Sequence, residues 1–246
     1  MNVHVNDSLA AGFRDGVPIG LGYLSVSVTF GMAAAAAGLP TAGAVLISMT
    51  NVTSAGQFAG LTLIAAGSSL IEMALTQLVI NLRYALMSLS LSQRLGPEFT
   101  TRRRMLIAFA NTDEIFAVAM GRTAPLTPAY MYGLAALPIL GWTGGTVVGA
   151  VAGAVLSPAV RSALGVALYS MFIAIVVPPM RHSKPVQAVV AAAVIVSCVF
   201  AWTPLSQAVG SGFAIVISTL AAAALGAWLF PMDVSPEADE EKEAAR

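Results

Sequence analysis

Eight strongly apolar stretches follow one another along this chain of 246 residues. A helix needs about 20 predominantly apolar residues to cross the hydrocarbon core of a bilayer, and several of the stretches approach or exceed that length. Charged residues make up only 10% of the chain, against about 25% in ordinary soluble domains. The sequence therefore predicts an all-α, polytopic integral membrane protein folded as a helical bundle. The stretches cover approximately residues 17–37, 41–66, 69–91, 104–121, 129–156, 163–180, 185–201 and 210–230.

Charge is distributed unevenly along the chain. Residues 231–246 contain six of the twelve acidic residues and two of the twelve basic ones, so the rest of the chain has ten bases and six acids. An excess of lysine and arginine is typical of cytoplasmic loops. We therefore expect a cytoplasmic N-terminal segment at 1–16, a single transmembrane domain at 17–230 and an acidic cytoplasmic tail at 231–246.

Two of the apolar stretches are interrupted by small and polar residues. The interruptions read NVTSAGQFAG at 51–60 and LPILGWTGGTVVG at 137–149. Non-helical backbone at membrane depth needs protein or water to satisfy its polar groups, so such breaks often line a site. Close packing of helices through small residues is the alternative explanation. We expect both stretches to be broken or re-entrant.

The two clearest basic loops, at 94–104 and 181–184, bear on this expectation. Eight crossings would place them on opposite sides of the membrane, against the positive-inside tendency. If both interrupted stretches enter and leave by the same face, both basic loops and both termini lie inside. The prediction is therefore six crossings and two broken or re-entrant segments, with Arg122 and Arg161 outside.

One stretch, residues 71–90, is long enough to cross a bilayer but contains several polar side chains. At about 100° per residue its residues divide into three helix faces. Ionisable groups at membrane depth are costly and mark functional candidates, so we expect the apolar face to meet lipid and the other two to line a polar cavity. The three faces are Ile71, Leu75, Leu78, Leu82, Leu86 and Leu89; Glu72, Thr76, Arg83, Met87 and Ser90; and Gln77, Asn81, Tyr84 and Ser88.

Two carboxylates, Asp113 and Glu114, lie inside the apolar stretch that follows. Arg83 precedes the connecting loop near Glu98 by as many residues as Asp113 follows it. In an antiparallel pair of helices the two positions reach similar depth, because both helices rise about 1.5 Å per residue. We expect Arg83 to pair with Asp113 or Glu114, which leaves the other carboxylate for a substrate ammonium group, a proton or another base. A purely structural salt bridge is the alternative, and Glu72 is too distant to take part.

Gln57 and Trp142 are weaker candidates, one in each interrupted stretch. Broken helices expose N–H groups to a carboxylate and carbonyl groups to a cation, which would suit a zwitterionic amino acid. Trp142 could instead be an anchor at the membrane interface, and Gln57 could bond to freed backbone.

Signatures of common enzymes are absent. The chain contains no HExxH, GxSxG or GxxxxGKS/T motif, and its only histidines, His4 and His182, lie near segment ends. Cys198 is the only cysteine, which excludes an intramolecular disulfide and a cysteine metal cluster. The sequence therefore predicts a protein that is not an enzyme and has neither cofactor nor metal. A passive channel for small polar solutes stays open, because polar stripes and broken helices also build selectivity filters.

Four short motifs stand out in the chain: AGQF at 55–58, NLRYALM at 81–87, TDE at 112–114, and GW at 141–142 followed by the glycine pair Gly144 and Gly145. These motifs resemble those of the AzlC family of branched-chain amino acid permeases. The opening RDGVPIGLGYLSVSVTFG also resembles the first segment of the family, and the resemblance covers the chain from about residue 12 to residue 230.

The resemblance implies a multi-pass permease of the inner (plasma) membrane that exports amino acids, typically leucine, valine, isoleucine or methionine. It also implies a small AzlD-like membrane subunit as partner, and no nucleic acid. The lack of an ATP-binding motif fits a secondary transporter, and the three acidic candidates motivate a hypothesis of coupling to a proton gradient. A non-transporting structural or signalling subunit is a further alternative. The substrate-binding or coupling candidates are Gln57, Glu72, Gln77, Asn81, Arg83, Tyr84, Asp113, Glu114 and Trp142.

Overall fold

The computed structural model describes residues 8–153, 157–204 and 209–231, and these form ten α-helices and no strand. The helices are α1 (Leu9–Ala36), α2 (Thr41–Thr50), α3 (Ser54–Ala65), α4 (Leu70–Arg94), α5 (Thr101–Phe109), α6 (Asp113–Gly121), α7 (Pro128–Ala152), α8 (Pro158–His182), α9 (Lys184–Trp202) and α11 (Ser211–Leu229). Among the described residues, α1, α4, α7, α9 and α11 are long and apolar enough to cross a membrane. The prediction of an all-α polytopic membrane protein is confirmed, while the exact number of crossings stays a prediction.

The chain divides into two compact units, residues 1–171 and 172–246. The first contains α1 to α7 and the beginning of α8, and the second contains the rest of α8 with α9 and α11. The expectation of a single transmembrane domain at 17–230 stays a prediction. The acidic tail expected at 231–246 lies outside the described residues apart from Pro231.

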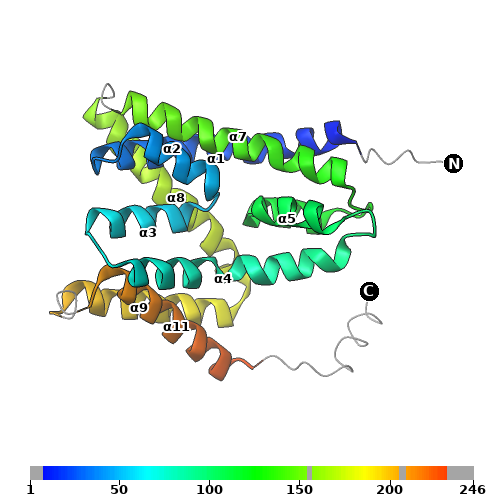
Figure 1. Cartoon of the computed structure of the whole chain (residues 1–246). Helices are drawn as coiled ribbons and strands as arrows, with labels where there is room; N and C mark the ends of the chain where they lie inside the picture. The colour runs from blue at the N-terminus through cyan, green and yellow to red at the C-terminus, as the bar shows by residue number, and fades with distance from the viewer. Residues whose placement is uncertain (1–7, 154–156, 205–208, 232–246) are drawn as a thin grey trace. The chain divides into compact units, whose positions relative to one another are not determined.

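Helices α1 and α7 lie side by side and run in the same direction (Figure 1). Glycines bring their backbones together: a Cβ atom at Gly16 would lie 2.8 Å from a carbonyl oxygen of α7, and Cβ atoms at Gly141 or Gly145 would overlap α1. Small residues at such contacts let membrane helices approach closely. The break predicted at 137–149 is therefore wrong, because α7 continues through Pro138 and its glycines form the packing surface for α1.

The other predicted interruption, in 41–66, does turn the chain back on itself. Gln57 of α3 donates to Ser48 Oγ of α2 over 2.9 Å, and Leu61 of α3 packs in one cluster with Ala44 of α2. Both pairs are centred on the turn between the two helices, so α2 and α3 form an antiparallel hairpin. Each helix is about 15–18 Å long at about 1.5 Å per residue, which is about half of a ~30 Å hydrocarbon core.

A second hairpin, α5–α6, replaces the continuous helix expected at 104–121. The chain leaves α5 after Phe109, and Thr112 caps α6 by accepting a hydrogen bond from the Ile115 N–H at 3.5 Å. Arg94, the last residue of α4, donates to the carbonyl oxygens of Met120 and Arg122 over 2.6 and 2.7 Å. The end of α6 therefore returns to the point where α4 ends and α5 begins. The two hairpins approach the middle of α4 from opposite ends (Figure 1).

One end of this first unit carries most of its basic residues. Arg122 lies 3.7 Å from Asp15 near the start of α1, and its backbone oxygen accepts from Arg94. Arg122 is therefore on the same side as the start of α1 and the end of α4, so its predicted position on the outside, opposite to these two, is wrong. The opposite loops, 37–40 and 66–69, contain no lysine or arginine. The positive-inside tendency consequently favours the cytoplasm for the basic end.

Helix α4 shows the predicted division into faces. All six residues of the leucine stripe are exposed, from 40% for Leu75 to 69% for Ile71. On another face Glu72 and Thr76 are buried, with 7% and 0% exposure. The stripe is free to meet lipid, while the polar faces of α4 turn toward the two hairpins.

Candidate functional site

The tips of both hairpins meet the middle of α4. An Arg83 guanidinium nitrogen lies 2.7 Å from Asp113 Oδ2, at the start of α6. The neighbouring Tyr84 donates to Thr53 Oγ1 at the start of α3 over 3.2 Å. Arg83 also donates to the Tyr84 hydroxyl over 3.1 Å, with its guanidinium 4.9 Å from the tyrosine ring centre. The pairing expected from the register about Glu98 is thus present, and its role in transport stays a prediction.

The second carboxylate of that motif has a different partner. Glu114 accepts a hydrogen bond from the hydroxyl of Tyr23 in α1. The Tyr23 ring packs edge-on against Trp142, with ring centres 5.3 Å apart. Glu114 is therefore bonded to a neutral side chain that can both donate and accept, rather than to a second base.

Gln57 and Trp142 lie together, which their separate positions in the sequence did not predict. Trp142 Nε1 donates to Gln57 Oε1 over 2.7 Å, and Gln57 Nε2 donates to Ser48 Oγ over 2.9 Å. Ser48 shares a further hydrogen bond of 2.7 Å with Thr146. All four residues are buried. Trp142 is thus neither an interfacial anchor nor part of a break, and it joins α7 to the first hairpin.

Gln77 and Asn81 connect α4 to the start of α3. Gln77 Nε2 donates to the carbonyl oxygen of Gly56 over 2.8 Å. Asn81 Nδ2 donates to the carbonyl and side-chain oxygens of Gln77 over 2.8 and 3.1 Å. Both residues are therefore placed beside the first hairpin tip, as their shared helix face predicted.

Glu72 is the one acidic candidate that lies apart from this group. It is in the first turn of α4, where Ser69 accepts a hydrogen bond from its backbone N–H over 3.1 Å. A carboxylate in the first turn of a helix is favoured by the helix dipole. The distance from Arg83 that the sequence predicted is confirmed, and a coupling role for Glu72 stays a prediction.

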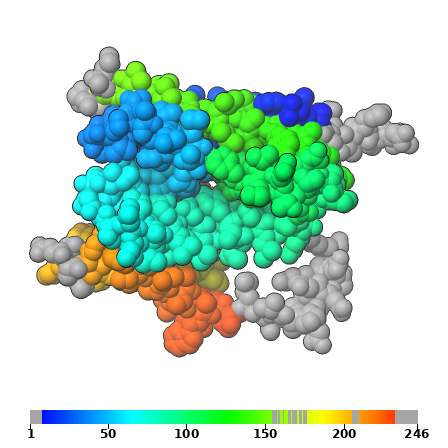
Figure 2. Space-filling view, in the orientation of Figure 1, coloured from blue at the N-terminus to red at the C-terminus, as the bar shows by residue number. Residues whose placement is uncertain are grey.

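A cavity of about 270 Å³ lies between the two tips. Figure 2 shows the blue and cyan helices of the first hairpin meeting the green helices of the second beside α4. The lining side chains are polar or apolar but uncharged. They are Thr50, Asn51, Val52 and Thr53 from the first tip, Ala108, Phe109 and Asn111 from the second, and Asn81 and Tyr84 from α4.

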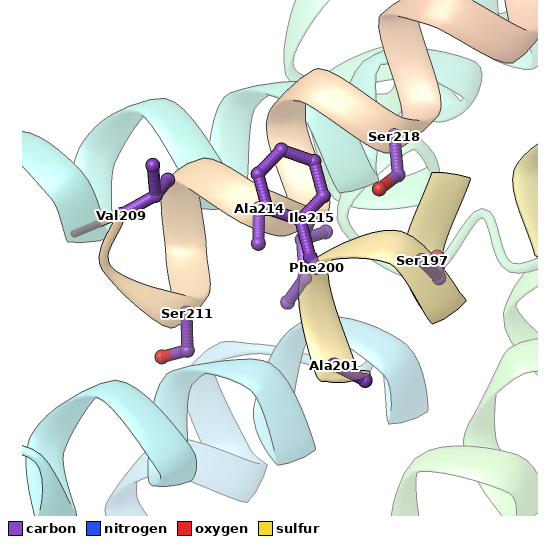
Figure 3. A pocket seen from close by; sticks show the side chains of 8 residues that line it. All are labelled: Ser197, Phe200, Ala201, Val209, Ser211, Ala214, Ile215 and Ser218. Atoms are coloured by element: carbon purple, nitrogen blue, oxygen red, sulfur yellow. The ribbon is translucent and has the colours of Figure 1, made fainter. Parts of the chain in front are cut away.

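Two further cavities differ in character. One of about 420 Å³ beside α1 is lined by Tyr23 and Glu114 together with mostly apolar residues. Another, of about 320 Å³, lies in the second unit between α9 and α11 (Figure 3). Its polar groups are the hydroxyls of Ser197, Ser211 and Ser218, and no ionisable side chain lines it. The charged and amide candidates therefore gather in the first unit.

Sequence reasoning missed Tyr23, Ser48, Asn111 and Thr146. Tyr23, Ser48 and Thr146 each have apolar or glycine neighbours on both sides, and an isolated hydroxyl is equally compatible with a bond to its own helix backbone. Asn111 carried the one usable signal, because Asn and Thr in succession favour a helix start over a helix interior. Within the described residues, no group of three or more His, Cys, Asp or Glu side chains is arranged to hold a metal ion.

Comparison with known proteins agrees with a membrane protein. A family model described as AzlC protein matches residues 18–156. The inner membrane protein YgaZ of Escherichia coli strain K12 is 32% identical over 180 residues, which are 70% of this chain and 74% of that protein. An uncharacterized membrane protein of Archaeoglobus fulgidus is 31% identical over 71% of this chain and 78% of its own. An uncharacterized membrane protein of Helicobacter pylori strain J99 is 32% identical over 61% of this chain and 67% of its own length. No solved structure matches.

Proposed function

Because this chain belongs to the AzlC family of membrane proteins, we propose that it is a permease of the inner membrane that exports amino acids. The proposed cargo is a branched-chain amino acid (leucine, valine or isoleucine) or methionine. Membership of the family supports the transport role, and the motif resemblance together with the chemistry of the hairpin tips supports the cargo.

The observation that carries this proposal is the meeting of two half-length hairpins at the middle of a crossing helix. At each tip one helix ends and another begins, so carbonyl groups and N–H groups without intrahelical partners lie close together. Discontinuous helices of this kind bind zwitterionic substrates and coupling ions in secondary transporters. The Arg83–Asp113 ion pair and the Tyr23–Glu114 hydrogen bond lie at the second tip.

Asp113 and Glu114 also supply the groups for coupling to a proton gradient. Each accepts a bond from a donor on a different helix, Arg83 on α4 and Tyr23 on α1. Protonation of either carboxylate would weaken its bond and release the second tip from that helix. This supports an exchange in which proton entry accompanies substrate exit.

We include a small AzlD-like membrane subunit in the proposed transporter. Arg83 and Asp113 keep 44% and 31% of their side-chain surface exposed. Charged side chains at membrane depth are unfavourable unless protein or water surrounds them. The exposed part of this ion pair therefore supports a further protein surface at this position.

The proposal is tested by efflux from cells that express the chain with and without the candidate subunit. Cells are loaded with leucine-, valine- or methionine-containing peptides, and release of the free amino acids is followed. We expect saturable efflux that continues against a concentration gradient and slows when the pH gradient is collapsed. Efflux that only equalises the concentrations would favour the passive channel, and no efflux of any of these amino acids would contradict the proposal.

A further inference from the structure

An apolar groove of about 440 Å³ lies between α1 and α7. Aliphatic side chains and glycines are its only lining, so no side chain in it can form a hydrogen bond to a ligand. Gly20 and Gly141 bring the two helix backbones together within it. The side chains along its edge are between 40% and 65% exposed, and they are Val17, Leu21, Leu24 and Leu140. The groove therefore fits a flexible hydrocarbon chain.

Arg14 lies at one end of this groove. It precedes Val17 by three residues and Leu21 by seven, and these spacings place side chains on one face of a helix. Because Cα–Cβ bonds tilt toward the N-terminus of a helix, the Arg14 side chain leans away from the apolar length of the groove. It leans toward the basic end of the first unit, which the positive-inside tendency assigns to the cytoplasm.

The charge of Arg14 is only partly balanced within the chain. Its Nε atom lies 3.5 Å from Asp15 Oδ1. The other oxygen of Asp15 accepts from the Tyr130 hydroxyl over 2.9 Å and lies 3.7 Å from Arg122. Two arginines therefore share one carboxylate, and the group has a net positive charge. The Arg14 side chain is 74% exposed and that of Arg122 only 15%, so an external anion can reach Arg14.

We propose that this groove binds an anionic phospholipid of the cytoplasmic leaflet, with an acyl chain between α1 and α7 and the phosphate group at Arg14. A guanidinium group can bind phosphate through two parallel hydrogen bonds, and basic residues at the cytoplasmic surface of a membrane attract anionic lipids. A zwitterionic lipid has the same acyl chains, but its own cationic group balances its phosphate. The site should therefore select a lipid by the charge of its head group.

The test uses the full chain in phosphatidylcholine nanodiscs, with Cys198 replaced by serine and a fluorophore attached at Leu140→Cys. Quenching is compared for phosphatidylglycerol and phosphatidylcholine that have the same brominated acyl chains. Phosphatidylglycerol should be enriched at the fluorophore by about fivefold, the usual effect of one arginine near an anionic lipid surface. A fluorophore at Leu82→Cys should show no such enrichment. Leu82 belongs to the exposed leucine stripe of α4, and it lies as many residues from the end of α4 as Leu140 lies from the start of α7.

Substitutions assign the head-group selectivity to one side chain. Arg14→Gln should remove the preference for phosphatidylglycerol, and Arg14→Lys should keep it because the charge stays. Arg102→Gln removes an exposed arginine of α5, outside the groove, and should leave the preference unchanged. Raising the ionic strength should weaken the preference in the labelled chain that retains Arg14, because salt screens charges at a surface. This last measurement needs no substitution at Arg14, so it holds even if Arg14→Gln does not fold.

Three outcomes would overturn the inference. Equal quenching by the two lipids at Leu140→Cys would mean that the groove does not select a head group. An equal loss of preference in Arg14→Gln and Arg102→Gln would mean that diffuse surface charge, rather than this groove, attracts the lipid. Quenching by both lipids at Leu82→Cys but by neither at Leu140→Cys would mean that a protein surface covers the groove. None of these measurements involves efflux, so the inference does not depend on the export proposal.

Discussion

Arg83 and Asp113 form an ion pair in which a guanidinium nitrogen lies 2.7 Å from a carboxylate oxygen. Arg83 is in the middle of the crossing helix α4, and Asp113 is the first residue of α6, at a hairpin tip. The pair therefore ties a membrane-length helix to a half-length one. Because Tyr84 reaches the other tip through Thr53, two successive residues of α4 hold both hairpins.

Neutral substitution of either member of the ion pair should abolish export. Arg83→Gln and Asp113→Asn each leave an unpaired charge, which costs about 3–5 kcal/mol where a pair is fully buried and less here, since the pair is partly exposed. Efflux from loaded cells measures the effect, and Arg102→Gln, at an exposed position in the first turn of α5, is the control. The double reversal, Arg83→Asp with Asp113→Arg, should restore assembly without transport. Normal export by both single variants would show that the pair is not needed.

Cysteine labelling should place both ends of each hairpin on one side of the membrane. In a chain whose Cys198 is replaced by serine, Gly38→Cys and Ser68→Cys flank α2–α3 and should react from the same side. Arg102→Cys in the first turn of α5 and Thr123→Cys just after α6 should react from the other side, which the basic residues mark as cytoplasmic. Labelling of Gly38→Cys and Ser68→Cys from opposite sides would mean that α2–α3 crosses the membrane.

Adjacent glycines of α7 should respond very differently to a large side chain. A Cβ atom at Gly145 would overlap the backbone of α1, whereas a Cβ atom at Gly144 has nothing within 4 Å. We expect Gly145→Leu to lower the free energy of unfolding by about 1–3 kcal/mol or more through overpacking, and Gly144→Leu to have little effect. Thermal unfolding in detergent compares the two, and equal melting temperatures would argue against the close α1–α7 contact.

The hydrogen bond between Trp142 and Gln57 should contribute to the stability of the first unit. Trp142→Phe keeps an aromatic ring beside Tyr23 but leaves the buried Gln57 Oε1 without its 2.7 Å donor. A buried acceptor that loses its donor costs about 1–3 kcal/mol, so the melting temperature should fall. Trp202→Phe, at a residue that is 83% exposed, should melt like the unsubstituted chain. If the two variants melt alike, the hydrogen bond does not stabilise the fold.

Features that depend on one helix, or on the register of two stretches joined by a short loop, could be predicted from the sequence. The leucine stripe of α4 followed from spacing alone, because the helical period decides which side chains share a face. The pairing of Arg83 with Asp113 or Glu114 followed from equal distances to the loop at Glu98, because helices of equal rise bring such positions to equal depth, and the structure shows that the partner is Asp113. The break in α5–α6 does not disturb this register, since it falls immediately before Asp113.

Features that depend on which helices pack together, or on where a stretch turns back, required the tertiary structure. Glycine-rich sequence at 137–149 is compatible with a break or with close packing, and only the presence of α1 against Gly141 and Gly145 decides for a continuous helix. The opposite outcome is found at Asn111, where a stretch that was expected to continue as one helix turns back instead. The Asn111 amide is bonded there to Ser88 of α4, a partner that the stretch itself does not contain.

The sequence by itself determined that this chain is a helical membrane protein, which face of α4 avoids its neighbours, and which charges share a depth. These properties follow from apolar length and helical period, which are local. Only the tertiary structure decided which stretches turn back as hairpins, and that Gln57 meets Trp142 and Glu114 meets Tyr23. Such pairs join residues far apart in the chain, and the sequence alone does not specify the distance between helices that are not neighbours in it.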